Sequence, residues 1–138
     1  MAKEQLYKKK FASICFETES KSIEIVWNGF VKLEEFKEAM NAALDFYYEK
    51  NATNWLIDQT NRQAVPASVN EWVVNEFFPR LLDAATPGCK IATIVSKDVF
   101  SRFTMRTQTD SLLSKYDKKM VPFEYFQNES EAYLWFAS

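Results

Sequence analysis

The sequence predicts a single α/β domain over residues 1–138, with a mixed sheet of about five strands and about four helices. The length of 138 residues fits one domain. Hydrophobic residues make up 47% of the chain and include 12 Phe, 6 Tyr and 4 Trp, enough for a sizeable core. Strand-like and helix-like stretches alternate, so we expect the order β-β-α-β-α-β-α-β-α, an N-terminal hairpin followed by βα repeats.

The first half begins with two strand-like stretches, residues 11–17 and 22–27, which are rich in β-branched and aromatic residues. The break between them is short enough for a hairpin. Residues 32–50 carry apolar side chains three and four positions apart, the pattern of an amphipathic helix. The apolar run Trp55–Ile57, closed by Asp58, has the length of a buried central strand.

The second half continues the alternation. Ser68 and Glu71 form a capping-box pair that predicts a helix start, and Pro79 should kink or end that helix. Residues 90–95 have the β-branched composition of a parallel strand. Asp98 is expected to cap a third helix, whose middle section, residues 104–111, is mostly polar.

The C-terminal segment predicts one more strand and one more helix. Residues 122–126 form the strand, and Asn128 with Glu131 caps a helix that carries several aromatic side chains. At the other end of the chain, Lys8–Lys10 are interpreted as a solvated terminus rather than a phosphate or lipid site.

Charge, cysteines and hydropathy restrict the partners and the compartment. The formal net charge of −2 supplies no positive field for nucleic acid. Cys15 and Cys89 lie in apolar stretches without a CxxC pattern, as buried thiols in a reducing compartment do. No stretch reaches the 18 or more apolar residues of a membrane span, and the N-terminus has no signal-peptide pattern. We expect a cytoplasmic protein without a membrane span.

Composition disfavours the common catalytic sites. The chain has no histidine, which removes Ser-His and Cys-His nucleophile systems and the commonest transition-metal ligand. Only two glycines are present, so neither a GxGxxG turn nor a P-loop can form. We therefore expect no catalytic residues, no metal site and no cofactor; an enzyme would have to rely on Asp58 or a cysteine.

Two groups of residues are candidates for a binding site. Ligands of parallel sheets bind beyond the carboxyl ends of the strands, which indicates the polar stretch 58–62 and residues 96–97. Asp58, Asn61 and Arg62 are selected there, although loop hydrogen bonds of Asp58 and Asn61 and a surface ion pair of Arg62 are the simpler explanation of the same residues. Trp72 and Phe103 represent the helical aromatic residues, which either line an apolar pocket or fill the core.

The sequence resembles a known family. IVWNGF, WLIDQTNR, SVNEWVVNEFFPRLL, KIATIVSKDVF and FEYFQNESEAYLWF are similar to segments of the STAS-like domains of bacteria, in particular the uncharacterised SpoIIAA-like group. The resemblance covers nearly the whole chain. It implies a four- or five-stranded sheet with helices packed against it, and a cytoplasmic module that is often a homodimer. Better-known members are switched by phosphorylation within an Asp-Ser-Ser-Gly-like motif, which residues 58–62 do not match.

Two functions follow as expectations. The first is a noncatalytic module that binds a small apolar or amphipathic, lipid-like ligand, with Asp58 or Arg62 at its polar end. The alternative is a STAS-type regulatory module that binds another protein through an exposed helix face, for which Arg106 and Asp110 are the residues to mutate.

Overall fold

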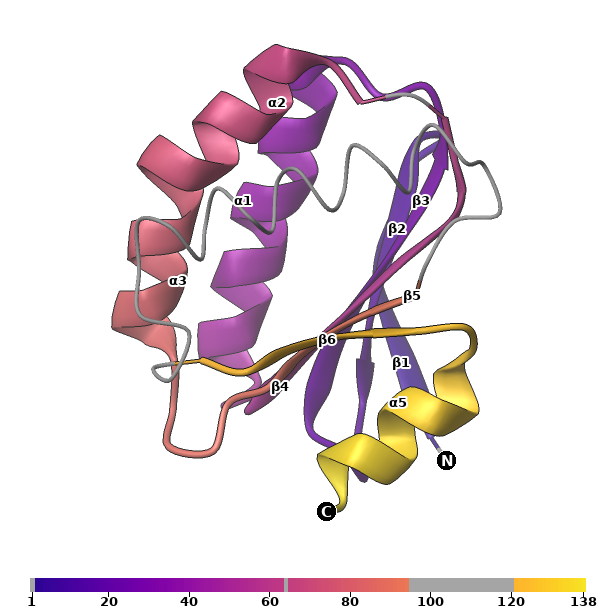
Figure 1. Cartoon of the computed structure of the whole chain (residues 1–138), viewed down its shortest axis with the longest axis vertical. Helices are drawn as coiled ribbons and strands as arrows, with labels where there is room; N and C mark the ends of the chain where they lie inside the picture. The colour runs from indigo at the N-terminus through magenta and orange to yellow at the C-terminus, as the bar shows by residue number, and fades with distance from the viewer. Residues whose placement is uncertain (1, 64, 95–120) are drawn as a thin grey trace.

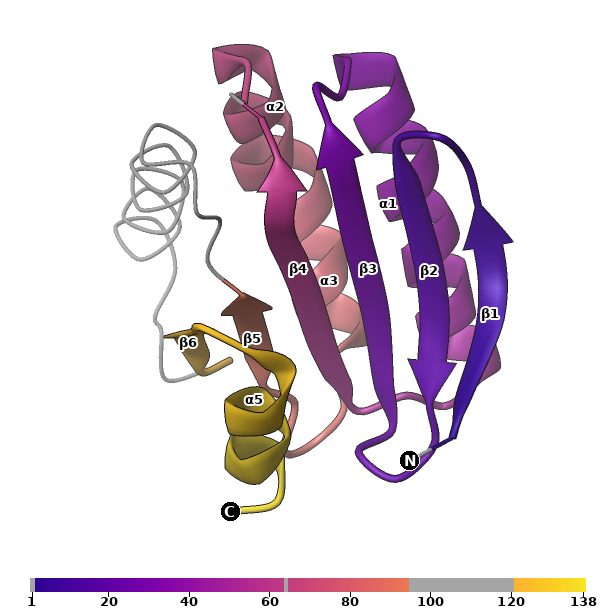
Figure 2. The same cartoon turned by 90° about the vertical axis from the view of Figure 1, so that its right-hand side faces the viewer.

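The computed structural model describes residues 2–63, 65–94 and 121–138. In these residues six strands form one mixed sheet in the order β1-β2-β3-β4-β5-β6 (Figure 2). The strands are β1 (Lys3–Lys8), β2 (Ala12–Glu17), β3 (Ser22–Gly29), β4 (Asn54–Arg62), β5 (Ile91–Ile94) and β6 (Phe123–Phe126). The first three strands are antiparallel, and β3 to β6 are parallel. The predicted α/β class and the hairpin of residues 11–17 and 22–27 are confirmed.

Helices cover both faces of the sheet. Figure 1 shows α1 (Leu33–Glu49) on one face, beside a continuous helical segment made of α2 (Ala67–Trp72), the π-helical turn η1 (Val73–Phe77) and α3 (Phe78–Ala84). The short helix α5 (Glu129–Phe136) lies on the opposite face. Among the helices of the described ranges, none has the length and apolar character needed to cross a bilayer.

Strand alternation divides the buried apolar side chains into two clusters. On β4, Trp55 belongs to the main core with α1, α2 and α3, whereas Leu56 belongs to a small cluster under α5. Residues one apart point to opposite faces of a sheet, which explains the division. The face covered by α1 to α3 therefore holds most of the core.

Helix α1 forms as its sequence predicts. Its buried stripe contains Phe36, Ala39, Met40, Ala43, Leu44 and Tyr47. At its start, the Glu35 carboxylate accepts a hydrogen bond of 3.0 Å from the Lys32 amide. After its end, Asn51 adopts a φ of 52°, a left-handed conformation that asparagine tolerates and that stops the helix.

The prediction that the first strand begins at residue 11 is wrong, because residues 3–8 form β1 and raise the strand number to six. Lys8–Lys10 are exposed, as expected of solvated side chains. The charged residues of β1 weaken the alternating pattern by which a strand is predicted from the sequence. Lys3 and Glu4 make ion pairs, and Tyr7 packs against the main core. Lysines are common on edge strands, where they hinder pairing with a further chain, and β1 is such an edge.

The second helix also differs from its prediction. It starts at Ala67, after Pro66, and Ser68 lies in its first turn instead of capping it. Pro66 provides the extended conformation that precedes a helix, with φ −61° and ψ 146°. Pro79 does not end the helix: it lies in the first turn of α3, directly after the π-helical turn, and the helical segment continues to Ala84.

The C-terminal predictions are confirmed within the described residues. Strands β5 and β6 lie inside the predicted stretches 90–95 and 122–126. The side chain of Asn128 accepts a hydrogen bond of 3.0 Å from the Glu131 amide at the start of α5. The helix expected to begin at Asp98 lies outside the described residues, so three helical segments of the expected four are described.

Candidate ligand-binding cavity

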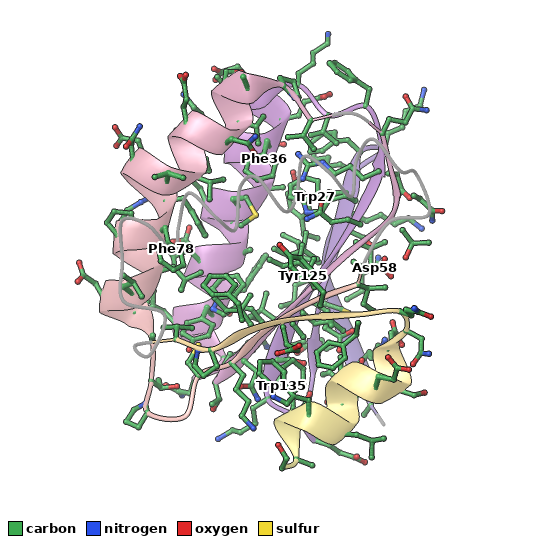
Figure 3. The ribbon with its side chains drawn as sticks, viewed as in Figure 1. Trp27, Phe36, Asp58, Phe78, Tyr125 and Trp135 are labelled. Carbon is green, nitrogen blue, oxygen red and sulfur yellow. The ribbon has the colours of Figure 1, made fainter. Side chains whose placement is uncertain are left out.

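A cavity of about 70 Å³ lies in the main core, between the helices and the parallel part of the sheet. Its walls come from β3, β4, β5, β6, α1 and the η1–α3 segment. Among the described residues it is lined by Trp27, Phe36, Met40, Ile57, Gln59, Arg62, Val73, Phe77, Phe78, Leu81, Ile91, Thr93, Phe123 and Tyr125. Figure 3 shows Trp27, Phe36 and Phe78 between the helices and the sheet. Most of this lining is apolar.

A β-bulge at the end of β4 decides which of its polar side chains reach the cavity. Val26 of β3 pairs with Asp58, but Asn28 pairs with Asn61, so Trp27 faces two residues of β4. The extra residue reverses the alternation of side chains beyond it. Arg62 consequently points to the helix side and is 2% exposed, whereas Asn61 is exposed.

Arg62 is held by aromatic rings and by one neighbouring side chain. The central carbon of its guanidinium lies 5.2 Å from the centre of the Trp27 ring and 5.0 Å from that of Phe36. These two rings stack on each other with centres 4.8 Å apart. Arg62 Nη1 donates a hydrogen bond of 3.0 Å to Gln59 Oε1. Burial lowers the pKa of Arg62 to about 10, which leaves the group charged at neutral pH.

The structure brings only one of the predicted binding residues into the described cavity lining, namely Arg62. Asp58 is not part of this lining, and its carboxylate accepts a hydrogen bond of 2.9 Å from the Thr60 amide. Trp72 lies behind the lining, with its ring centre 5.8 Å from that of Phe36. Phe103 and residues 96–97 lie outside the described residues.

The selection of Asp58, Asn61 and Arg62 omits two polar residues that do line the cavity, Gln59 and Thr93. Gln59 was recognisable as part of the polar stretch, two positions after Ile57 and therefore on the same face. Thr93 follows Ile91 by the same rule and is a polar side chain on the buried face of β5. Strand alternation is thus the signal that identifies both.

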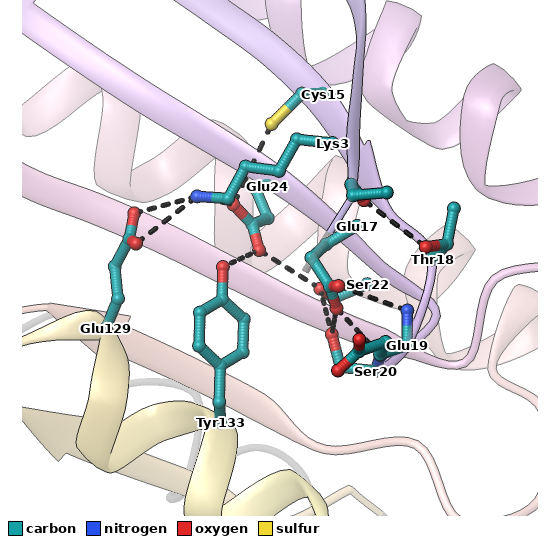
Figure 4. A network of polar contacts seen from close by, with 11 residues as sticks. Lys3, Cys15, Glu17, Thr18, Glu19, Ser20, Ser22, Glu24, Glu129 and Tyr133 are labelled. Carbon is teal, nitrogen blue, oxygen red and sulfur yellow. Dashed lines mark hydrogen bonds and ion pairs between the residues drawn. The ribbon is translucent and has the colours of Figure 1, made fainter.

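A second polar cluster lies on the opposite face of the sheet, beside α5 (Figure 4). The Glu24 carboxylate, 2% exposed, forms an ion pair of 3.0 Å with Lys3 and accepts hydrogen bonds from Tyr133 and Ser22. Lys3 also pairs with Glu129 at 3.1 Å. These contacts fasten α5 to β1 and β3.

The pKa shifts in this cluster follow from burial and from the nearby carboxylates. Partial burial disfavours the charge of Lys3, but hydrogen bonds to Glu24 and Glu129 outweigh it and raise the pKa of Lys3. Burial and the hydrogen bond to Glu24 both raise the pKa of Tyr133. Each shift favours the protonated form of its group in the folded protein.

Neither cysteine is activated as a nucleophile. Burial and the negative charge of Glu24 raise the pKa of the Cys15 thiol to about 12, and burial raises the pKa of Cys89. The thiolate is the reactive form, and it is scarce at neutral pH for both residues. Within residues 2–63, 65–94 and 121–138, no group of three or more Cys, Asp or Glu side chains is arranged to hold a metal ion.

Comparison with protein-family models finds no match for this chain, and comparison with curated proteins finds none either.

Proposed function

We propose that this domain is a noncatalytic binding module that holds a small apolar or amphipathic molecule in the cavity between its helices and its sheet. One observation carries the proposal: a mostly apolar cavity has polar side chains at the carboxyl end of β4, where Gln59 and Arg62 form part of the wall. Small-molecule sites have this composition, a mostly apolar lining with a few placed polar groups.

The rigidity of the polar part supports the proposal. Arg62 is fixed beside the stacked Trp27 and Phe36 rings and by its hydrogen bond to Gln59. A group whose position is already fixed loses little conformational entropy when a ligand binds. The opposite wall includes Val73 and Phe77 of the π-helical turn, a kind of irregularity that occurs frequently at functional sites.

The proposed role is binding rather than catalysis because the candidate reactive groups are poorly suited to chemistry. The two thiols have raised pKa values. Asp58, the remaining candidate, is occupied by the Thr60 amide and is not among the described residues of the cavity wall.

The proposal includes membership of the SpoIIAA-like group of STAS-like domains and a cytoplasmic location. The mixed sheet, with an antiparallel hairpin preceding parallel strands, supports this assignment. The alternative function is a regulatory module that binds a protein partner or a second copy. On α5, Leu134 is 74% exposed and is the apolar side chain that such an interface would cover. Light scattering of the wild type and of Leu134→Ser tests it; a monomer in both cases would count against a homodimer.

Native mass spectrometry of gently purified protein tests the proposed function, together with melting temperatures measured with fatty acids of increasing length. We expect a copurifying small molecule or a rise in melting temperature that depends on ligand concentration. Ile57→Phe, which adds volume inside the cavity wall, should abolish either effect. Val26→Phe is the matched control, because Val26 lies on the neighbouring strand and points to the other face. Absence of both effects in the wild type would refute the proposal.

A further inference from the structure

Two polar side chains of the cavity have hydrogen-bonding groups without protein partners in the described residues. Gln59 is 6% exposed, and its Oε1 accepts the bond from Arg62. Its NH₂ group donates to no acceptor in the described part of the chain. Thr93 is 8% exposed, and its hydroxyl has no hydrogen-bond partner in the same residues. Neither polar atom is among the fully buried side-chain atoms that lack a partner in the described residues, so both are accessible from the cavity, where water or a ligand can pair with them.

These two residues belong to one small region of the sheet. Thr93 of β5 is directly opposite Ile57 of β4, and Gln59 is the next residue of β4 on that face. Both line the same cavity as Arg62. A single small molecule can therefore contact the side chains of all three residues.

The chemistry of the three side chains selects the ligand's polar group. The amide NH₂ of Gln59, the hydroxyl of Thr93 and the guanidinium of Arg62 can all donate hydrogen bonds. A carboxylate accepts hydrogen bonds only, at two oxygens with about four lone-pair sites, and is the common group that matches several convergent donors.

The size of the cavity limits the apolar part of the ligand. A cavity needs a volume of about 10–15 Å³ to hold one water molecule, and a cavity of about 150 Å³ holds benzene. The cavity found here, about 70 Å³, lies between these values. It suits a chain of about three to five carbon atoms rather than a long acyl chain.

We propose that the cavity binds a short-chain carboxylate, whose oxygens accept hydrogen bonds from Gln59 and Thr93 and whose alkyl chain contacts the aromatic wall. This proposal rests on the proposed function and specifies its ligand class. It assigns to Gln59 and Thr93 a role in selecting the head group.

Isothermal titration calorimetry with butyrate, 1-butanol and octanoate tests this proposal on the full chain. Butyrate should bind the wild type, and Gln59→Leu and Thr93→Val should each weaken it about tenfold, the effect of losing one hydrogen bond of about 1.4 kcal/mol. Binding of 1-butanol should change less in Gln59→Leu. Asn61→Leu is the matched control, because Asn61 is exposed on the same strand, and it should leave butyrate binding unchanged.

The outcomes separate this proposal from the proposed function. Binding of octanoate without binding of butyrate would refute the short chain and leave the binding function standing. Equal binding of butyrate to the wild type and both variants would refute the role of Gln59 and Thr93. Failure of all three probes, with no copurifying molecule, would refute both proposals. Thr93→Val nearly conserves volume, and its circular dichroism spectrum establishes that a loss of binding is not a loss of folding.

Discussion

Thr93→Val should stabilise the ligand-free protein, because the threonine hydroxyl faces an otherwise largely apolar cavity and has no protein partner in the described part of the chain. Leaving such a group unpaired costs about 1–3 kcal/mol. The cavity has room for water, so the lower end of this range applies, and the added methyl group gains up to about 0.8 kcal/mol by burial. We expect a net gain of about 1 kcal/mol in the free energy of unfolding, or about 4 °C in melting temperature.

Urea unfolding of the ligand-free protein, followed by tryptophan fluorescence and far-UV circular dichroism, measures this gain. Thr53→Val is a suitable comparison, since Thr53 lies in the loop before β4 and outside the described cavity lining. A loss of more than about 1 kcal/mol in Thr93→Val would show that the hydroxyl does form a hydrogen bond in the native state, and it would remove the basis of the ligand assignment.

Three further predictions concern the rest of the molecule. Tyr133→Phe should lower the free energy of unfolding, measured in urea, by about 1–2 kcal/mol, because Glu24 loses a charge-assisted hydrogen bond at a partly buried site. An unchanged free energy of unfolding would contradict the conclusion that the Tyr133–Glu24 contact holds α5 against the sheet. Stability should begin to fall above about pH 8, because burial raises the folded-state pKa values of Cys15 and Cys89 above that of an unfolded thiol, about 8.5. It should fall more steeply above about pH 10, because the folded-state pKa values of Lys3 and Tyr133 are also raised and such contributions are lost once the unfolded groups deprotonate. Lys3→Met should make the loss of stability above about pH 10 less steep. An equally steep loss in this variant would mean that other groups cause it. Trp55→Phe should cost less than about 2 kcal/mol in chemical denaturation, because the indole N–H of this fully buried residue has no partner among the residues that the structure describes, and its removal offsets part of the lost volume. A larger cost would indicate that the indole N–H does form a hydrogen bond.

The regular parts of the fold were predictable because local pattern and tertiary environment agree there. The stripe through Phe36 and Met40 is that of a helix in any context, and Trp55–Ile57 is apolar enough to require burial on both faces. Strand β1 was not predictable in the same way, because its alternation is weak and its charged residues are stabilised by partners distant in sequence, such as Glu129. Only the folded chain brings those partners together.

The candidate site was predictable as a region but not residue by residue. Its place at the carboxyl ends of parallel strands follows from topology, which the sequence indicates. The choice between Asn61 and Arg62 depends on a bulge, and neither glycine nor another sequence signal marks it. Thr93 was missed because a threonine in a β-branched run fits a strand whether or not its hydroxyl is used.

The β-bulge opposite Trp27 makes the wall of the cavity tolerant of one deletion in β4 but not of two. Deleting Thr60 would restore strict pairing and leave Asn61 facing outward and Arg62 facing inward, because Trp27 would then be opposite Gln59 alone. Deleting both Thr60 and Asn61 would instead place Arg62 opposite Asn28, where it would face outward. The loss of a second residue would thus remove the cation from the cavity wall without any substitution.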